Sequence, residues 1–268
     1  MRIAGADFEA ERARIWDAPG PRWFRPEDPI WRVHDDAAMF VGGIRALLLQ
    51  SLHPVAMAAV ADHSGYRSDP WGRLQRISHF LAVTTYGPVP AAERSIAIVR
   101  AVHRSVRGTT PEGVAYRADD PDLLSWIHLA EVDSFLTAHQ AFAPRPLGDA
   151  EADRYVAQTS QVAARLGVPE PPRTRADVVE QLAAFRPALA WTPAARDAAD
   201  LLLADPPLTG PARPGYRALA AGAVSLLPPW VRVELGLPTL PFTDRLVARP
   251  VARRVLGTLR WALQAPIS

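Results

Sequence analysis

The stretch "PAAERSIAIVRAVHRSVRG" (residues 90–108) carries the clearest folding signal in the chain. Proline at its start, an acidic residue in its first turn and glycine at its end predict a helix with both boundaries marked. At helical spacing, Ile96, Val99, His103 and Val106 lie on one side of that helix. The stretch therefore predicts an amphipathic helix that carries an imidazole within its apolar stripe.

Most of the remaining chain has the same helical periodicity, and its prolines fall mostly between the periodic segments. Thr174 and Asp177 form a possible capping pair, and Pro54 breaks or kinks the segment around it. No segment alternates long enough to predict a strand. The predicted helices cover 36–64 (two helices), 69–87, 90–108, 120–142, 149–167, 174–189, 192–205, 214–227 and about 242–263.

This pattern predicts an all-α fold, a single-domain helical bundle of about ten helices that enclose a pocket. The length of 268 residues is enough for one large domain. We expect the domain to span 1–268, with its core motifs in 30–142 and its C-terminal helices in 149–263.

The composition excludes several classes of protein. The chain has no cysteine, which excludes disulfides, thiolate metal sites and iron–sulfur clusters. All thirty basic residues are arginine, so a Schiff-base lysine and a P-loop are excluded too. The arginines are interleaved with acids and the net charge is only +2, so no nucleic-acid partner is expected. Abundant Ala, Pro and Arg indicate a GC-rich bacterial genome.

Neither the N-terminus nor any apolar run predicts targeting or membrane insertion. Residues 1–16 lack the apolar segment of a signal peptide, and the longest uncharged apolar run, 218–227, is too short to span a bilayer. We expect a soluble, cytoplasmic protein, to which a lipid-like substrate would come either by peripheral contact with a membrane or by delivery. The oligomeric state is not predicted.

The common catalytic motifs are missing from the sequence. The seven histidines form no His-Glu-x-x-His or repeated Glu-x-x-His pattern, and no Gly-x-Ser-x-Gly elbow occurs. Gly42-Gly43 follows no strand, which favours a close helix crossing over a dinucleotide-binding loop.

His103 has two interpretations. A lone histidine on an apolar helix face is commonly a core residue whose hydrogen bonds are satisfied. An imidazole in apolar surroundings can also ligate iron, and arginine is well suited to the propionate carboxylates of haem. Arg100 and Arg107 lie within one helical turn of His103.

Two further clusters have similar alternatives. Arg73, Arg76 and Ile77 share a helix face, which predicts either a solvated basic ridge or part of a site. In 116–142, the side chains of His128, Glu131, Val132 and Phe135 share a face, and a buried histidine–carboxylate contact could lock that helix.

The clusters follow one another in a familiar order. "LLLQSLHPVAMAAVADHSGYRSDPWGRLQRI" (47–77), "VRAVHRSVRG" (99–108) and "GVAYRADDPDLLSWIHLAEVDS" (113–134) resemble motifs of the MpaB-type oxygenase family, also called DUF2236. This family includes the rubber oxygenase known as latex clearing protein. "RLGVPEPP" (165–172) and "LPPWVRVELGLP" (227–238) resemble its weaker C-terminal motifs, so the resemblance covers most of the chain.

The resemblance implies an all-α fold around one haem b, with His103 as the axial iron ligand. Arg100 and Arg107 would orient the ligand helix or pair with propionates, and His128 would be a structural or pocket residue. On the distal side the family pattern maps onto Arg73, Arg76 and position 77. Arg73 would stabilise an anionic oxygen species. Characterised members cleave carbon–carbon double bonds with O₂ in polyisoprene or a prenyl chain.

The sequence departs from the family pattern at the distal positions. Ile77 replaces the usual threonine, which removes a hydroxyl group, and Arg76 replaces a lysine, which removes a possible amine ligand. The acidic residue proposed as a base in rubber-cleaving members has no clear match, and Asp62 is the nearest candidate.

Two functional hypotheses follow. The first is a haem b-dependent oxygenase that acts with O₂ on a small apolar substrate, isoprenoid or lipid-like. The alternative is a non-catalytic haem or apolar-ligand binding protein that kept the fold and lost the distal threonine. A Soret band would separate both from a helical enzyme or scaffold without cofactor.

Overall fold

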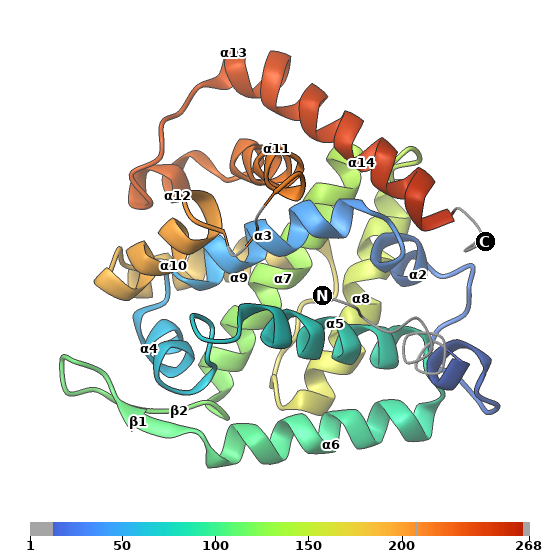
Figure 1. The fold of residues 1–268 in the computed structure, drawn as a ribbon. Helices are drawn as coiled ribbons and strands as arrows, with labels where there is room; N and C mark the ends of the chain where they lie inside the picture. The colour runs from blue at the N-terminus through green and yellow to red at the C-terminus, as the bar shows by residue number, and fades with distance from the viewer. Residues whose placement is uncertain (1–12, 207, 209, 265–268) are drawn as a thin grey trace.

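The computed structural model describes residues 13–206, 208 and 210–264. These residues form an all-α helical bundle, as the sequence predicts (Figure 1). Besides short π- and 3₁₀-helical segments at Ala13–Asp17 (η1), Arg186–Ala188 (η2) and Asp244–Ala248 (η3), the helices are α2 (Pro29–His34), α3 (Ala38–Gln50), α4 (Pro54–His63), α5 (Pro70–Tyr86), α6 (Val89–Ser105), α7 (Pro121–Phe142), α8 (Asp149–Leu166), α9 (Arg175–Phe185), α10 (Pro193–Leu203), α11 (Ala212–Ser225), α12 (Pro229–Glu234), α13 (Pro241–Thr243) and α14 (Arg249–Gln264).

Helix α7 runs through the centre of the bundle and packs against α3, α8 and α9. On one side of α7, helix α11 packs on α3, and α14 packs on α11. On the other side, α6 lies along α5 and also contacts α8, and it forms the lower edge of the molecule in Figure 1. Two layers of helices therefore flank α7, and α6 is the outermost helix of one of them.

The crossing of α3 and α7 explains the glycine pair. A Cβ atom at Gly42 would lie 3.3 Å from the carbonyl oxygen of Ser134, whereas a Cβ at Gly43 would meet nothing within 4 Å. Beside this contact, the buried Arg45 forms an ion pair of 2.7 Å with Asp133 and donates a hydrogen bond of 2.8 Å to Ser134. The predicted close helix crossing is confirmed, and it depends on the first glycine of the pair.

Most helix boundaries agree with their sequence signals. Thr174 and Asp177 form the predicted capping box at the start of α9, and Pro54 begins α4 after the break that follows α3. One boundary prediction is wrong, because α6 ends at Ser105 instead of continuing to residue 108.

The chain after α6 turns into a short hairpin that the sequence did not predict. Strands β1 (Arg107–Thr109) and β2 (Ala115–Arg117) pair antiparallel, with Gly108 opposite Tyr116. A Cβ atom at Gly108 would lie 2.3 Å from the Tyr116 hydroxyl oxygen, so the glycine makes room for the ring across the ladder. Arg107 therefore extends from a strand and not from the helix that carries His103.

Among the described helices, none is by itself long and apolar enough to cross a bilayer. Helices α3 and α4 reach that length and apolarity only as a pair, and they are bent by 109° at the break between them. The N-terminal segment that was examined for a signal peptide lies mostly outside the described residues.

Candidate functional site

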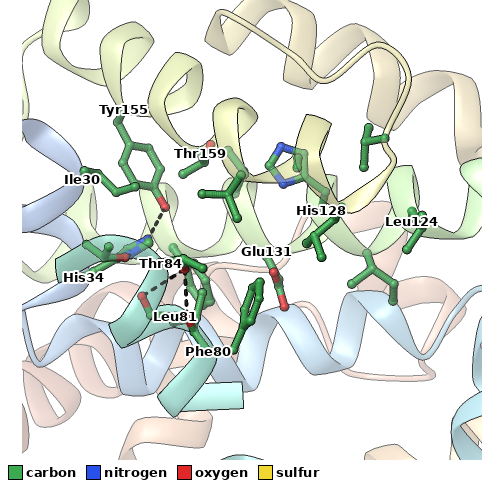
Figure 2. A pocket seen from close by; sticks show the side chains of 18 of the residues that line it. Ile30, His34, Phe80, Leu81, Thr84, Leu124, His128, Glu131, Tyr155 and Thr159 are labelled. Carbon is green, nitrogen blue, oxygen red and sulfur yellow. Dashed lines mark hydrogen bonds between the residues drawn. The ribbon is translucent and has the colours of Figure 1, made fainter. Parts of the chain in front are cut away.

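A cavity of about 110 Å³ lies between α2, α5, α6, α7 and α8. Its wall is mostly apolar, although several polar side chains also line it. Figure 2 shows the cavity from close by, with His34 and Tyr155 toward one end, His128 and Leu124 toward the other, and Glu131 between them in this view. The polar side chains on the wall are His34, Thr84, Thr85, His103, His128, Glu131, Tyr155 and Thr159.

Helix α7 supplies the longest wall of the cavity. His128, Glu131, Val132 and Phe135 all line it, so the face predicted from helical spacing is confirmed. Their spacing of three, four and seven residues places them along one side of the helix. The sequence therefore located this wall, although not the cavity that it borders.

The end of the cavity near α2 is closed by a hydrogen-bonded histidine. His34 Nδ1 lies 2.8 Å from Thr85 Oγ1, and His34 Nε2 lies 3.3 Å from the Tyr155 hydroxyl oxygen. Burial lowers the pKa of His34 to about 3, so the ring is neutral at physiological pH. Because both ring nitrogens have partners, this histidine braces α2 against α5 and α8.

Two other histidines of the cavity wall have a buried nitrogen that finds no partner among the described residues. Nδ1 of His103 on α6 and Nε2 of His128 on α7 are buried and form no hydrogen bond within the described part of the chain. Burial lowers the pKa of both, that of His128 to about 4, so each ring is neutral. The predicted histidine–carboxylate contact that would lock α7 is therefore not seen at this nitrogen. Neutral, unpartnered imidazole nitrogens on a cavity wall are suited to bind a ligand or an iron atom.

Glu131 is the acidic side chain on the described cavity wall. Burial raises its pKa to about 7, against the opposing effects of a hydrogen bond from Gln50 and the positive charge of Arg73. Arg73 lies behind the wall on α5, where its Nη1 donates a hydrogen bond of 2.6 Å to Ser64 Oγ. Burial lowers the pKa of Arg73, and the Glu131 carboxylate opposes that shift. Arg73 and Glu131 are thus electrostatic neighbours beside an apolar space.

The structure places the other distal candidates away from the wall. Arg76 is exposed and forms an ion pair of 3.4 Å with Asp69. Ile77 is half-buried, on the same α5 face as Arg73 and one turn before the lining residues Phe80 and Leu81. Neither residue lines the cavity as it stands.

The remaining candidates lie on the outer surface. Arg100 is exposed and donates a hydrogen bond of 3.3 Å to the Arg165 carbonyl oxygen, while Arg107 donates one of 3.3 Å to the Arg104 carbonyl oxygen. Asp62 is exposed and accepts a hydrogen bond of 2.6 Å from the Tyr116 hydroxyl group. The structure therefore brings His103 and His128 together at one cavity and leaves Arg100, Arg107 and Asp62 outside it.

The sequence did not predict that His34 and Glu131 line a cavity. Glu131 was noticed only as a partner of His128, three residues away, and His34 stands alone in a short helix. Within the described ranges, no three His, Asp or Glu side chains converge to form a metal site. An iron atom already held by a porphyrin needs only one such ligand from the protein.

Comparison with known proteins identifies one family. A family model described as "ER-bound oxygenase mpaB/B'/Rubber oxygenase, catalytic domain" matches residues 31–261. No curated protein matches the chain, and no solved structure does either. The matched range contains every helix from α3 to α13 and every residue that lines the cavity except Ile30.

Proposed function

Because the chain belongs to the family of ER-bound mpaB/B' oxygenases and rubber oxygenases, we propose that it is a haem b-dependent oxygenase that cleaves a double bond in a small apolar substrate. The observation that carries the proposal is His103, whose buried Nδ1 has no partner among the described residues and whose ring lines an apolar cavity. The substrate would be isoprenoid or lipid-like. The single domain would extend over 1–268, beyond the matched residues.

The residues of the cavity are chemically compatible with haem b. A neutral imidazole is the form that ligates iron, and burial keeps His103 neutral. The apolar walls from α5, α7 and α8 suit the faces of a porphyrin ring. Arg100, three residues before His103 on α6, and Arg107, on β1 just after that helix, are both exposed and would pair with propionates.

The size of the cavity requires an adjustment of the fold. A volume of about 110 Å³ is smaller than a porphyrin. Helix α6 is the wall best able to yield, because only Ala92 and Ile96 of its seventeen residues are buried. We therefore expect haem binding to displace α6 outward, and with it His103.

When bound, haem iron supplies the activation of O₂ that double-bond cleavage needs. The side chains of the chain would do the rest. Phe80, Leu81 and Phe135 would bind the apolar substrate and exclude water. Arg73 would hold a fixed positive charge beside the cavity, where a low dielectric strengthens its effect on developing negative charge. Glu131, with its pKa near 7, would hold or release a proton at its carboxyl oxygens.

The alternative function is a non-catalytic haem or apolar-ligand binding protein. Ile77 favours it, because an isoleucine cannot donate the hydrogen bond that a threonine offers at this position. Arg76 also favours the alternative, because it is exposed and paired with Asp69 instead of facing the cavity.

An absorption titration tests the proposal. We expect purified full-length protein to bind added haem b with a shifted Soret band that saturates at one haem per chain. A titration without that shift would contradict the oxygenase and the haem-binding form of the alternative. If haem binds, O₂ consumption with a short polyprenyl substrate then supports the oxygenase, and a haem-loaded protein that consumes no O₂ supports the alternative.

A further inference from the structure

Helix α6 has two different faces. Its inner face carries Ala92, Ile96 and the cavity-lining His103. Its outer face carries Ile98 and Val102, whose side chains are 65% and 53% exposed. A spacing of four residues places these two side chains in one stripe along the surface. One helix therefore separates the cavity from an exposed apolar stripe.

Positive charge surrounds that stripe. The segment from Arg94 to Arg107 contains four arginines and no acidic residue, and all four are exposed. Arg100 and Arg107 donate hydrogen bonds to backbone carbonyl oxygens, and Arg107 also interacts electrostatically with Asp119. An exposed helix that combines large aliphatic side chains with arginines is typical of segments that lie on a membrane surface.

The neighbouring elements add to the apolar surface. Trp71 and Leu74 are exposed on α5, which packs along α6, and Val114 is exposed at the tip of the hairpin that follows α6. Figure 1 shows α6 and the hairpin at one edge of the molecule, with no described helix beyond them. Nothing in the described part of the chain covers this edge.

We propose that the outer face of α6 docks on an anionic lipid bilayer. Ile98 and Val102 would enter the boundary between headgroups and acyl chains, and the exposed Arg94 and Arg104 would bind lipid phosphates. The docked helix would place the cavity one helix away from the bilayer. The reason for docking, delivery of an apolar substrate, rests on the proposed function; the binding itself needs no haem.

A second exposed apolar patch provides the control. Phe242 on α13 and Leu246 on η3 are 81% and 69% exposed, at the opposite edge of the molecule from α6 in Figure 1. The nearby Asp244 forms an ion pair with Arg232, so this patch lacks the uniform positive charge of α6. If exposed apolar side chains bound vesicles nonspecifically, this patch would contribute to binding as much as α6.

Co-sedimentation of the full chain with vesicles tests the proposal. We expect binding to vesicles that contain about one quarter phosphatidylglycerol, little binding to pure phosphatidylcholine, and release at high salt. The double variant Ile98→Asp/Val102→Asp and the double variant Arg94→Gln/Arg104→Gln should each weaken binding at least about tenfold. Circular dichroism should be unchanged, because all four positions are exposed.

The control variant Phe242→Ser/Leu246→Ser should bind vesicles as the unmodified chain does. Loss of binding in this control, or equal binding to neutral and anionic vesicles, would overturn the proposal. So would a dimer in solution that Ile98→Asp/Val102→Asp dissociates, because the stripe would then contact a second copy. Haem titration of the same variants keeps the two proposals distinguishable, since a docking variant should still bind haem.

Discussion

Gly42 on α3 and Phe135 on α7 are in direct contact, and a Cβ atom at Gly42 would lie 2.9 Å from Phe135 Cδ1. The Phe135 ring lines the cavity on its other side and meets the His34 ring edge-on, with centroids 5.8 Å apart. The close approach of two helices therefore sets the position of a cavity wall. Any side chain at Gly42 would push that wall inward or separate α3 from α7.

The Gly42→Ala variant should lower the free energy of unfolding by about 2 kcal/mol, because the added methyl group overpacks this crossing. Thermal unfolding followed by circular dichroism measures the change, with an expected fall of about 5 °C in Tm. Gly43→Ala is the matched control: a Cβ there meets nothing within 4 Å, so the helix should be unchanged or slightly stabilised. Equal effects of the two substitutions would contradict the close-contact account.

The sequence predicted the helices well because their boundaries depend on local chemistry. The Thr174–Asp177 capping box and the break at Pro54 are decided by residues within one turn of the boundary. The hairpin after α6 was missed because each strand has three residues, too few for a period of two to show.

The cavity was harder to predict, because a lining side chain and a core side chain look the same in a sequence. His128 and Glu131 were recognised as sharing a face, yet only the positions of α5 and α8 make that face a cavity wall. His34 carried no signal at all, since its partners Thr85 and Tyr155 are far from it along the chain. The exposure of Arg76 could not be predicted because helical spacing does not reveal which face is exposed, and that of Arg107 because α6 ends at Ser105, before it.

Glu131 should make the free energy of unfolding depend on pH between pH 4.5 and pH 7, above the range in which an ordinary glutamate titrates. The folded chain holds this proton up to a pKa of about 7, whereas the unfolded chain releases it near 4.5. Stability is therefore lost as the pH rises between these two values. Glu131→Gln should be more stable than the unmodified chain by about 3 kcal/mol at pH 8 and nearly equal to it at pH 4.5.

Urea unfolding at the two pH values measures this difference. Glu93→Gln, at an exposed position on α6, is the control and should leave the profile unchanged. A Glu131→Gln variant whose gain is the same at pH 4.5 and pH 8 would refute a carboxyl group that is protonated in the fold.

Two buried histidines should make the fold sensitive to acid. The pKa values of His34 and His128 are lowered to about 3 and about 4, while the unfolded chain binds protons at about 6.5. Their contribution to stability is complete above pH 6.5 and is lost as the pH falls toward the folded values. These two groups should therefore lower the free energy of unfolding by a few kcal/mol at pH 4.5, partly offset by Glu131, whose contribution has the opposite sign.

His128→Leu should flatten this acid limb, because it removes one of the groups that must take up a proton on unfolding. His63→Gln, at an exposed position on α4, is the comparison and should retain the profile of the unmodified chain. Calorimetry between pH 4.5 and pH 7 measures how Tm depends on pH in His128→Leu, His63→Gln and the unmodified chain. If the slope of Tm against pH is the same for all three proteins, His128 is not buried in the neutral form.

Ile77→Thr tests the side of the cavity where α5 lies. Ile77 is one turn before Phe80 and Leu81, and a bound porphyrin would reach past the present cavity toward it. A threonine hydroxyl group there should change the affinity of the haem protein for cyanide or imidazole several-fold, through one added hydrogen bond. Unchanged spectra and affinities would place residue 77 outside the haem pocket.

The identity of the iron ligand is tested most directly by removing one imidazole and supplying it again from solution. In the haem titration, His103→Gly should lose the shifted Soret band, and added imidazole should restore it, because the small molecule replaces the missing ring. His128→Leu should bind haem with an unchanged band. A His103→Gly variant that binds haem normally without imidazole, or a His128→Leu variant that loses it, would contradict the assignment of His103 as the axial ligand.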